Sequence, residues 1–191
     1  GFAGKLNFDS RIPLVASPSP QGEGGTDDSI KQKSSWALLT NANYEYLQKT
    51  FSAIERFRNV EFERDWNRGS TLQSDDQHII GGRIGLAKKQ NIIAYDYKSF
   101  LEGSFYQGMR HGANMNLGAK GFLLNAEGSY LDSKSSFNNT NFLRRRSSLS
   151  KEFKIQNSKF KVGIKEQQEL NKIKNKSTND LIPGSLQFQE W

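Results

Sequence analysis

The stretch His78-Ile79-Ile80-Gly81-Gly82-Arg83-Ile84-Gly85-Leu86-Ala87-Lys88 decides the fold of this chain. His78, Ile80, Ile84 and Leu86 fall on one parity, whereas Arg83, Gly85 and Ala87 fall on the other. In a β-strand, successive side chains point to opposite faces, so a period of two indicates a strand. The stretch therefore predicts a strand with one apolar face and one wet face.

The same alternation runs from about Trp36 to Glu169. It restarts at Ile93, Phe105, Phe122, Phe142 and Phe160 and predicts strands near 78–88, 92–102, 105–117, 121–132, 142–153 and 159–169. Most connections read as short turns, which leave no room for crossover helices, so neighbouring strands should pair antiparallel. The predicted fold is all-β: an antiparallel meander of long strands, either an open coiled sheet or part of a β-barrel.

Three segments are expected along the chain. Residues 1–35, with their Pro, Gly and Ser, read as a linker or loosely packed N-terminal segment, although the apolar residues from Leu6 to Val15 could add one strand. Residues 36–171 form the antiparallel sheet domain, with a further strand at Ile54–Trp66 and a longer polar loop at 133–141. Residues 172–191 read as a polar loop, to residue 184, and a short final strand that continues into a longer parent chain.

Composition restricts the setting of this sheet. The 191 residues are 35% hydrophobic and 12% aromatic, and no run of about 18 apolar residues exists, so a transmembrane helix is excluded. A membrane span built from strands remains open, because alternation dilutes its apolar residues. Strands of about 10–13 residues are also longer than the usual globular strand and match the length that a tilted membrane strand needs.

No catalytic, metal or cofactor site is predicted. Cysteine is absent, and neither His78 nor His111 has a second ligand nearby, although a metal needs three or four. Glu61, Glu63 and Asp65 share one face of a predicted strand, which favours a solvated acidic wall over a carboxylate pair for glycan hydrolysis. The chain is therefore expected not to be an enzyme.

The net charge of +7 favours anionic partners. Candidate contacts are Arg56, Arg58 and Arg64 on one predicted strand, and Arg144 and Arg146 on another. Consecutive arginines alternate between faces of a strand, so of the run 144–146 only Arg144 and Arg146 can act together. Expected partners are lipid or lipopolysaccharide and other parts of a longer envelope protein, whereas nucleic acid is not expected.

Several segments carry a resemblance to a protein family. They are Ile54-Glu55-Arg56-Phe57-Arg58-Asn59-Val60-Glu61-Phe62-Glu63-Arg64-Asp65-Trp66-Asn67, Tyr106-Gln107-Gly108-Met109-Arg110-His111, Phe142-Leu143-Arg144 and Leu149-Ser150-Lys151-Glu152-Phe153. Over about residues 36–171 this pattern resembles large uncharacterised β-rich outer-membrane or cell-envelope proteins of Bacteroidota. The resemblance implies consecutive strands of an assembly in the cell envelope, in the outer membrane or facing the periplasm, and it implies no activity.

Two functions stay open at this point. The first is a non-enzymatic structural segment of a bacterial outer-membrane or cell-envelope β-protein. The alternative is a soluble β-sheet binding module that holds an anionic partner (glycan, lipid headgroup or nucleic acid) on its basic face.

One prediction follows from the parity of the strand around Val60. Phe62→Ala should lower the free energy of unfolding by about 3 kcal/mol or more, since Phe62 shares the packed face with Val60 and Trp66. Glu63→Gln should cost well under about 1 kcal/mol, because an exposed charge contributes little. Denaturant titration of both variants measures this, and a larger loss for Glu63→Gln would reverse the two faces.

Overall fold

The structure is a computed structural model that describes residues 1–14, 36–51, 66, 75–155, 158–175, 177–178, 180 and 187–190. All regular structure within these residues is β-strand. None of the described segments forms a helix that could traverse a lipid bilayer.

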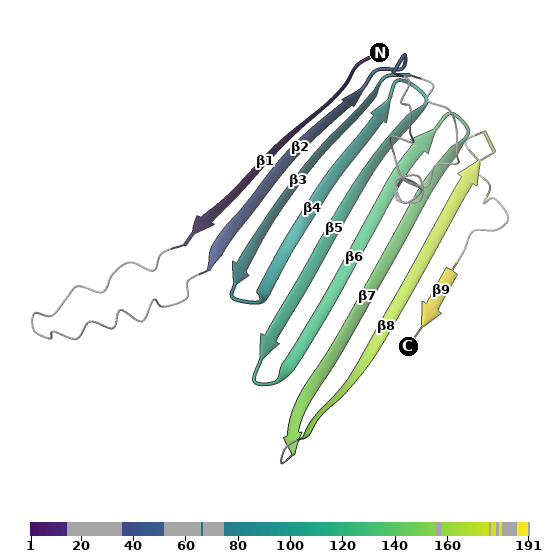
Figure 1. The fold of residues 1–191 in the computed structure, drawn as a ribbon. Coiled ribbons are helices and arrows are strands. Elements are labelled where there is room, and N and C mark those ends of the chain that lie inside the picture. Colours follow the sequence, from purple (N-terminus) through teal and green to yellow (C-terminus); the bar gives the residue numbers. More distant parts are fainter. Residues whose placement is uncertain are drawn as a thin grey trace, which may run out of the picture.

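Nine strands follow one another in the part of the chain that the structure describes, and they pair antiparallel in the same order (Figure 1). They are β1 (Ala3–Pro13), β2 (Ala37–Leu47), β3 (Gln77–Lys88), β4 (Asn91–Glu102), β5 (Tyr106–Ala119), β6 (Phe122–Ser135), β7 (Asn138–Ile155), β8 (Ser158–Asn175) and β9 (Gln187–Glu190). The predicted all-β meander is therefore confirmed, as a single open sheet. The sheet extends beyond the predicted boundaries of 36 and 171. On one side β1 pairs with β2 along its whole length, and on the other side β9 pairs with residues 167–170 of β8.

Two expected loops are wrong. Ser133–Asn141 was predicted as a polar loop, but β6 continues to Ser135 and β7 starts at Asn138. The turn is short because the Ser135 hydroxyl accepts hydrogen bonds from the backbone N–H groups of Phe137 and Asn138. Residues 172–175, also predicted as loop, extend β8 and pair with 138–141 of β7. The strand predicted at Ile54–Trp66 lies outside the described residues, apart from Trp66.

At the other end of the sheet, tight turns join consecutive strands. In the β5–β6 turn, Lys120 and Gly121 both have positive φ, at 48° and 81°. Positive φ at both central residues is the type I′ geometry, whose twist matches that of the flanking strands. Such a turn fixes which residues of the two strands face each other.

The cross-strand register defines two continuous faces. The polar face contains Asn41, Arg83, Asp96, Gly112, Ser129, Arg144 and Glu169, and the apolar face contains Leu6, Ile80, Tyr95, Met109, Tyr130, Leu149 and Ile164. Directly paired residues stand on the same side of a sheet, so neither face changes sides between β1 and β8.

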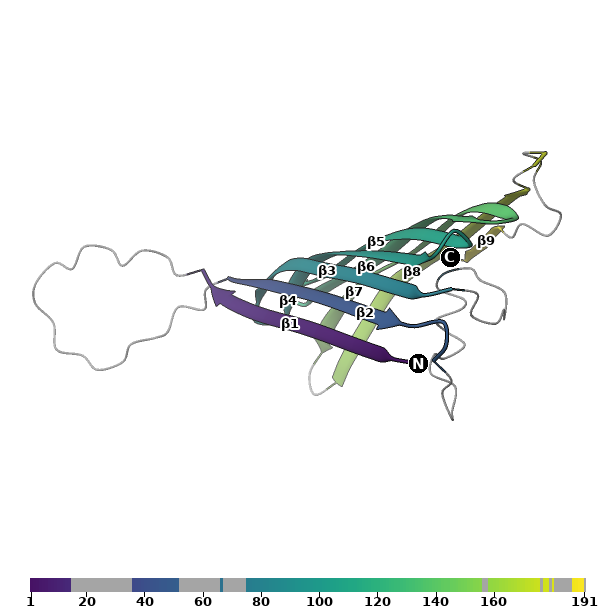
Figure 2. The ribbon, with the colours of Figure 1, turned by 90° about the horizontal axis from the view of Figure 1, so that it is seen from above.

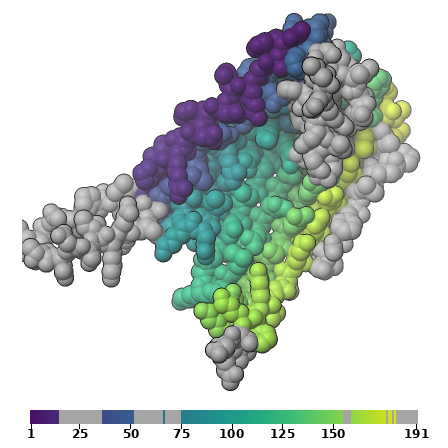
Figure 3. All heavy atoms as spheres, viewed as in Figure 1, coloured from purple at the N-terminus to yellow at the C-terminus, as the bar shows by residue number. Residues whose placement is uncertain are grey.

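The sheet is strongly twisted. Seen from above, β1 and β8 run in clearly different directions (Figure 2). A right-handed twist accumulates across neighbouring strands, and nine strands in one sheet amplify it. In the space-filling view, purple β1 and yellow-green β8 lie along opposite margins of the molecule (Figure 3).

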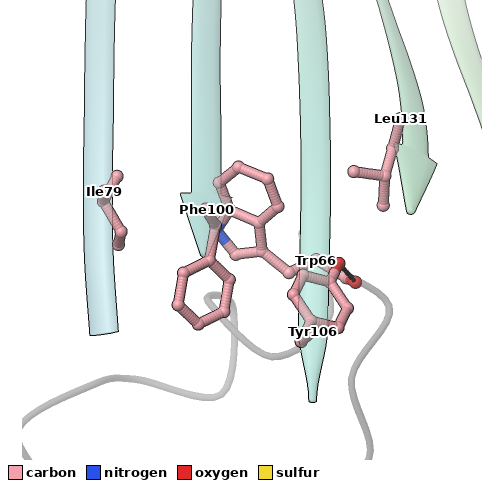
Figure 4. Close-up of a cluster of buried hydrophobic side chains, with 5 residues drawn as sticks. All are labelled: Trp66, Ile79, Phe100, Tyr106 and Leu131. Atoms are coloured by element: carbon pink, nitrogen blue, oxygen red, sulfur yellow. Dashed lines mark hydrogen bonds between the residues drawn. The ribbon is translucent and has the colours of Figure 1, made fainter. Parts of the chain in front are cut away.

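A small apolar core lies at one end of the polar face. Trp66, Ile79, Phe100, Tyr106 and Leu131 form this Trp66 cluster, in which Trp66 is 3% exposed and Phe100 is fully buried. The Trp66 indole packs edge-on against the Phe100 ring, which in turn contacts the Tyr106 ring, and the Tyr106 hydroxyl donates to the backbone oxygen of Trp66 (Figure 4). The predicted burial of Trp66 is confirmed, although Trp66 lies in a turn and not in the predicted strand.

A glycine makes this packing possible. A Cβ atom at Gly108 would lie 3.0 Å from Cε3 of Trp66 and 2.9 Å from the Tyr106 ring. Both distances are shorter than ordinary van der Waals contact, so a side chain at this position would push the indole off the sheet. Gly108 thus provides the space in which Trp66 lies.

Asp76 anchors the segment that enters β3. Its carboxylate accepts hydrogen bonds from the backbone N–H of Lys49 and the hydroxyl of Tyr46, at 2.8 and 2.9 Å. The Lys49 N–H, followed by the Tyr46 hydroxyl, lowers the pKa of Asp76 below its ordinary value.

The Trp66 cluster generates a stability prediction. Phe100→Ala should lower the free energy of unfolding by about 3–5 kcal/mol, because it opens a cavity among buried rings. Phe137→Ala is the matched control: Phe137 is 78% exposed in a turn, so its loss should cost less than about 0.5 kcal/mol. Guanidinium titration followed by tryptophan fluorescence measures both, and equal losses would show that the cluster does not stabilise the sheet.

Candidate functional site

Charged side chains cross the polar face from strand to strand. Arg83 on β3 lies 3.7 Å from Asp96 on β4, Glu127 on β6 lies 3.2 Å from Arg146 on β7, and Arg144 on β7 pairs with Glu169 on β8. All three pairs are direct cross-strand partners in the register. Opposite charges at such positions stabilise the pairing of the strands.

Small residues open a hollow in the middle of this face. Gly112 on β5 and Ser129 on β6 are paired neighbours in the row that runs from Asp96 to Arg144. The hollow has a volume of about 390 Å³ and is lined by Asp96, Lys98, Arg110, Gly112, Ala113, Asn114, Glu127, Gly128, Ser129 and Arg144. We name it the Gly112 hollow.

The cations at its rim differ in their surroundings. Arg144 donates from Nε to Glu169 Oε1, and its guanidinium lies 5.2 Å from the centre of the Phe142 ring. Lys98 is exposed and forms no ion pair with any described carboxylate. The ammonium group of Lys98 is thus available to an incoming anion.

A second hollow adjoins the first along β5–β7. It has a volume of about 250 Å³, shares Asn114 and Glu127 with the Gly112 hollow, and is also lined by Asn116, Asn125, Arg146 and Ser148. We name it the Asn116 hollow, because Oδ1 of Asn116 is buried there without a hydrogen-bond partner. An unsatisfied buried acceptor is unfavourable, so this amide favours a donor that reaches it.

Two of the five predicted anion contacts are described. Arg144 and Arg146 lie on the polar face, as their parity predicted, and each lines one of the two hollows. Arg145 lies on the opposite face, where Nη2 donates to Oε1 of Glu166 at 2.8 Å. Arg56, Arg58 and Arg64 lie outside the described residues, as do the acidic Glu61, Glu63 and Asp65.

Sequence reasoning missed the other rim residues. Lys98 and Arg110 are direct partners across β4 and β5, and they lie 46 and 34 positions from Arg144 along the chain. Parity alone places each on a face, but only the register of successive hairpins brings them to one hollow. The available signals were the turns at 103–105 and 120–121, which set the β4–β5 and β5–β6 registers.

The apolar face is exposed to its surroundings. Every exposed large apolar side chain within a described strand lies on it: Leu6, Phe8, Ile12, Tyr44, Ile80, Ile84, Leu86, Ile93, Tyr95, Met109, Phe122, Tyr130, Leu149, Phe153, Phe160, Val162 and Ile164. The buried apolar side chains of the described strands, by contrast, lie on the polar face, among them Ile79, Phe100, Tyr106 and Leu131 in the Trp66 cluster, and Ala37, Ala87 and Ala94 toward the other end.

The apolar residues form a band that runs obliquely to the strands. The row of paired residues that contains Leu86 on β3 and Ile93 on β4 continues through Ser147 on β7 to Glu166 on β8. On β8 the apolar residues Phe160, Val162 and Ile164 instead lie nearer the β7–β8 turn. The band is thus displaced along the strand direction as it crosses the sheet.

A repeated tyrosine–histidine arrangement borders this band. The hydroxyl of Tyr44 lies 2.8 Å from Nδ1 of His78, and that of Tyr95 lies 2.6 Å from Nδ1 of His111. In both cases the tyrosine two residues later, Tyr46 or Tyr97, is the direct cross-strand partner of the histidine.

A third pair repeats the diagonal geometry on the next hairpin. The Nδ2 amide of Asn141 on β7 donates to the hydroxyl of Tyr130 on β6 at 3.0 Å. We name these residues the tyrosine–histidine border: Tyr44, Tyr46, His78, Tyr95, Tyr97, His111 and Tyr130.

Neither histidine joins a metal-binding group. Within the described part of the chain, no cluster of three or more His, Asp or Glu side chains could hold a metal ion. Both histidines point to the apolar face with their tyrosine partners, at the parity that the sequence indicated.

Comparisons with models of known protein families, with curated proteins and with solved structures found no match to this chain.

The ion pairs of the polar face generate a prediction. A double-mutant cycle of Arg144→Gln and Glu169→Gln should give a coupling energy of about 1 kcal/mol, since both side chains are half-buried and directly opposed. The pair of Lys159 and Glu152, on the same two strands but more exposed, should give less than about 0.3 kcal/mol. Urea titration of the cycles measures both, and equal coupling would contradict a structural role for Arg144.

Proposed function

We propose that the chain is a non-enzymatic structural segment of a bacterial outer-membrane or cell-envelope β-protein. Its apolar face contacts the hydrocarbon of a lipid bilayer, and its polar face contacts water. In this arrangement the sheet separates two media, and its function is architectural.

The apolar face is the observation that supports this proposal. Water-soluble monomers rarely expose contiguous apolar patches larger than a few hundred Å². Here the exposed apolar side chains extend over eight strands, from Leu6 on β1 to Ile164 on β8. Exposure of this kind favours an apolar environment, and strands with apolar residues outside and polar residues inside are typical of membrane β-proteins.

The oblique band supports the same setting. Strands that cross a bilayer tilt by about 35–45° relative to its normal. A bilayer boundary then crosses neighbouring strands at successively shifted positions. A shift of this kind accounts for Glu166, which is polar although its row contains Leu86 on β3.

The tyrosine–histidine border fits the edge of the bilayer. Aromatic side chains with a polar tip concentrate where hydrocarbon meets headgroups, because one end is apolar and the other hydrogen-bonds. Tyr44, Tyr95 and Tyr130 each place a hydroxyl against a polar partner while their rings stay on the apolar face. Beyond this border, the same face carries Lys134, Asn139 and Lys174, which suit the headgroup region.

A charge placed in the band tests the proposal. Ile84 is 54% exposed on the apolar face. In a bilayer, Ile84→Lys should lower the free energy of unfolding by about 2–4 kcal/mol. For a water-exposed side chain the same substitution should be neutral within about 0.5 kcal/mol. Denaturant titration of the chain folded into lipid vesicles gives the value.

Asn7→Lys is the matched control, because Asn7 is exposed on the polar face and should tolerate the charge in vesicles. Separation of membranes from the soluble fraction, for the full product of the gene, provides an independent measurement. A product that stays monomeric in buffer without detergent, together with a neutral Ile84→Lys, would rule out the membrane setting and favour the soluble binding module.

A further inference from the structure

We propose that the Gly112 hollow and the Asn116 hollow together bind an acidic oligosaccharide, with the carboxylate of a uronic acid at Lys98 and Arg110 and a sugar further along the same oligosaccharide against Asn116. This binding site goes beyond the architectural function and does not depend on it, because the hollows open on the polar face.

The size of the hollows fits a small ligand. The Gly112 hollow, at about 390 Å³, lies within the range of small-molecule sites, which is about 300–1,000 Å³. Its floor is Gly112 and Ser129, and a Cβ atom at Gly112 would lie 3.4 Å from Cβ of Asp96. The adjoining Asn116 hollow adds about 250 Å³ and shares Asn114 and Glu127 with the first. The two volumes favour an elongated ligand of at least two linked rings.

The cations determine the charge of the ligand. Lys98, Arg110 and Arg144 face the Gly112 hollow from β4, β5 and β7. Arg144 is held in place by Glu169, so little side-chain entropy is lost when it binds. Lys98 has no described carboxylate partner, and a carboxylate that replaces water around its ammonium group gains a charge-assisted hydrogen bond.

The acids of the same rim limit the charge of the ligand. Asp96 and Glu127 also line the Gly112 hollow, and both accept hydrogen bonds when ionised. A phosphate, with nearly two negative charges, would be repelled by them, whereas sugar hydroxyls can donate to them. A monoanionic group on a hydroxyl-rich frame therefore suits the rim better than a phosphate does.

The Asn116 amide provides a separate argument for a hydrogen-bond donor. Its Oδ1 atom is buried without a partner in a side chain that lines the hollow, and because the terminal torsion of Asn is broad, a small rotation would be enough to present it to a ligand. Nearby Asn125 is already engaged, since its Nδ2 amide donates to the Ser148 hydroxyl at 3.4 Å. A sugar hydroxyl at this position would satisfy the acceptor.

Calorimetric titration tests the site. It uses the full chain in a non-ionic detergent that covers the apolar face. The probes are trigalacturonic acid, neutral maltotriose and inorganic phosphate. We expect trigalacturonic acid to bind at least tenfold more tightly than either other probe. Lys98→Gln should weaken it about tenfold, as expected for the loss of one hydrogen bond to a charged group.

Lys165→Gln is the matched control, because Lys165 is exposed on the polar face of β8 and lines neither hollow. It should leave the affinity unchanged within twofold. Circular dichroism of each variant separates loss of binding from loss of folding.

Three results would overturn the proposal: no binding of the trimer to the folded chain, equal binding of maltotriose, or a phosphate that binds as tightly as the trimer. Equal weakening by Lys98→Gln and Lys165→Gln would also overturn the proposal, because it would show that the trimer binds by non-specific attraction to positive charge. Each result is independent of the bilayer experiment, because the titration can be repeated in buffer if the chain proves soluble there.

Discussion

The structure depends on the preservation of side-chain parity through every strand pairing. From β1 to β8, each residue of the polar face is paired with a residue of the polar face. A slip of one residue in a single pairing would exchange the two faces of every following strand, so that the charges of their polar face would move to the apolar face. The tight turn at Lys120–Gly121 is therefore as important as the strands that it joins, because it fixes one of these registers.

Much of the sheet could be predicted from the sequence. The strands β3 to β6 are bounded by turn residues and alternate clearly, so their predicted ranges lie close to the observed ones. The error at Ser133–Asn141 has a physical reason: at this end both faces of the strand are polar, so alternation no longer distinguishes strand from loop. The same holds for residues 172–175 at the end of β8.

The candidate site was predictable only in part. The shared face of Arg144 and Arg146 follows from parity within one strand. The contribution of Lys98 and Arg110 could not be predicted, because it requires the register of three successive pairings between β4 and β7. The position of Trp66 over Gly108 could not be predicted either, because it is a contact between a single side chain and strands that are distant in the sequence.

The short pairing between β8 and β9 has a consequence for the margins of the sheet. β9 pairs with residues 167–170 only, so along residues 159–165 no described strand lies beside β8, and β1 likewise has a described neighbour on one side. The peptide N–H and C=O groups that point outward there need partners, and in hydrocarbon each group left without one would cost several kcal/mol. A bilayer would tolerate these two margins only if other backbone covered them. Water would solvate the backbone groups of these margins readily. The margins would then remain free to pair with another β-strand, and the apolar side chains of Phe160 and Val162 lie beside one of them.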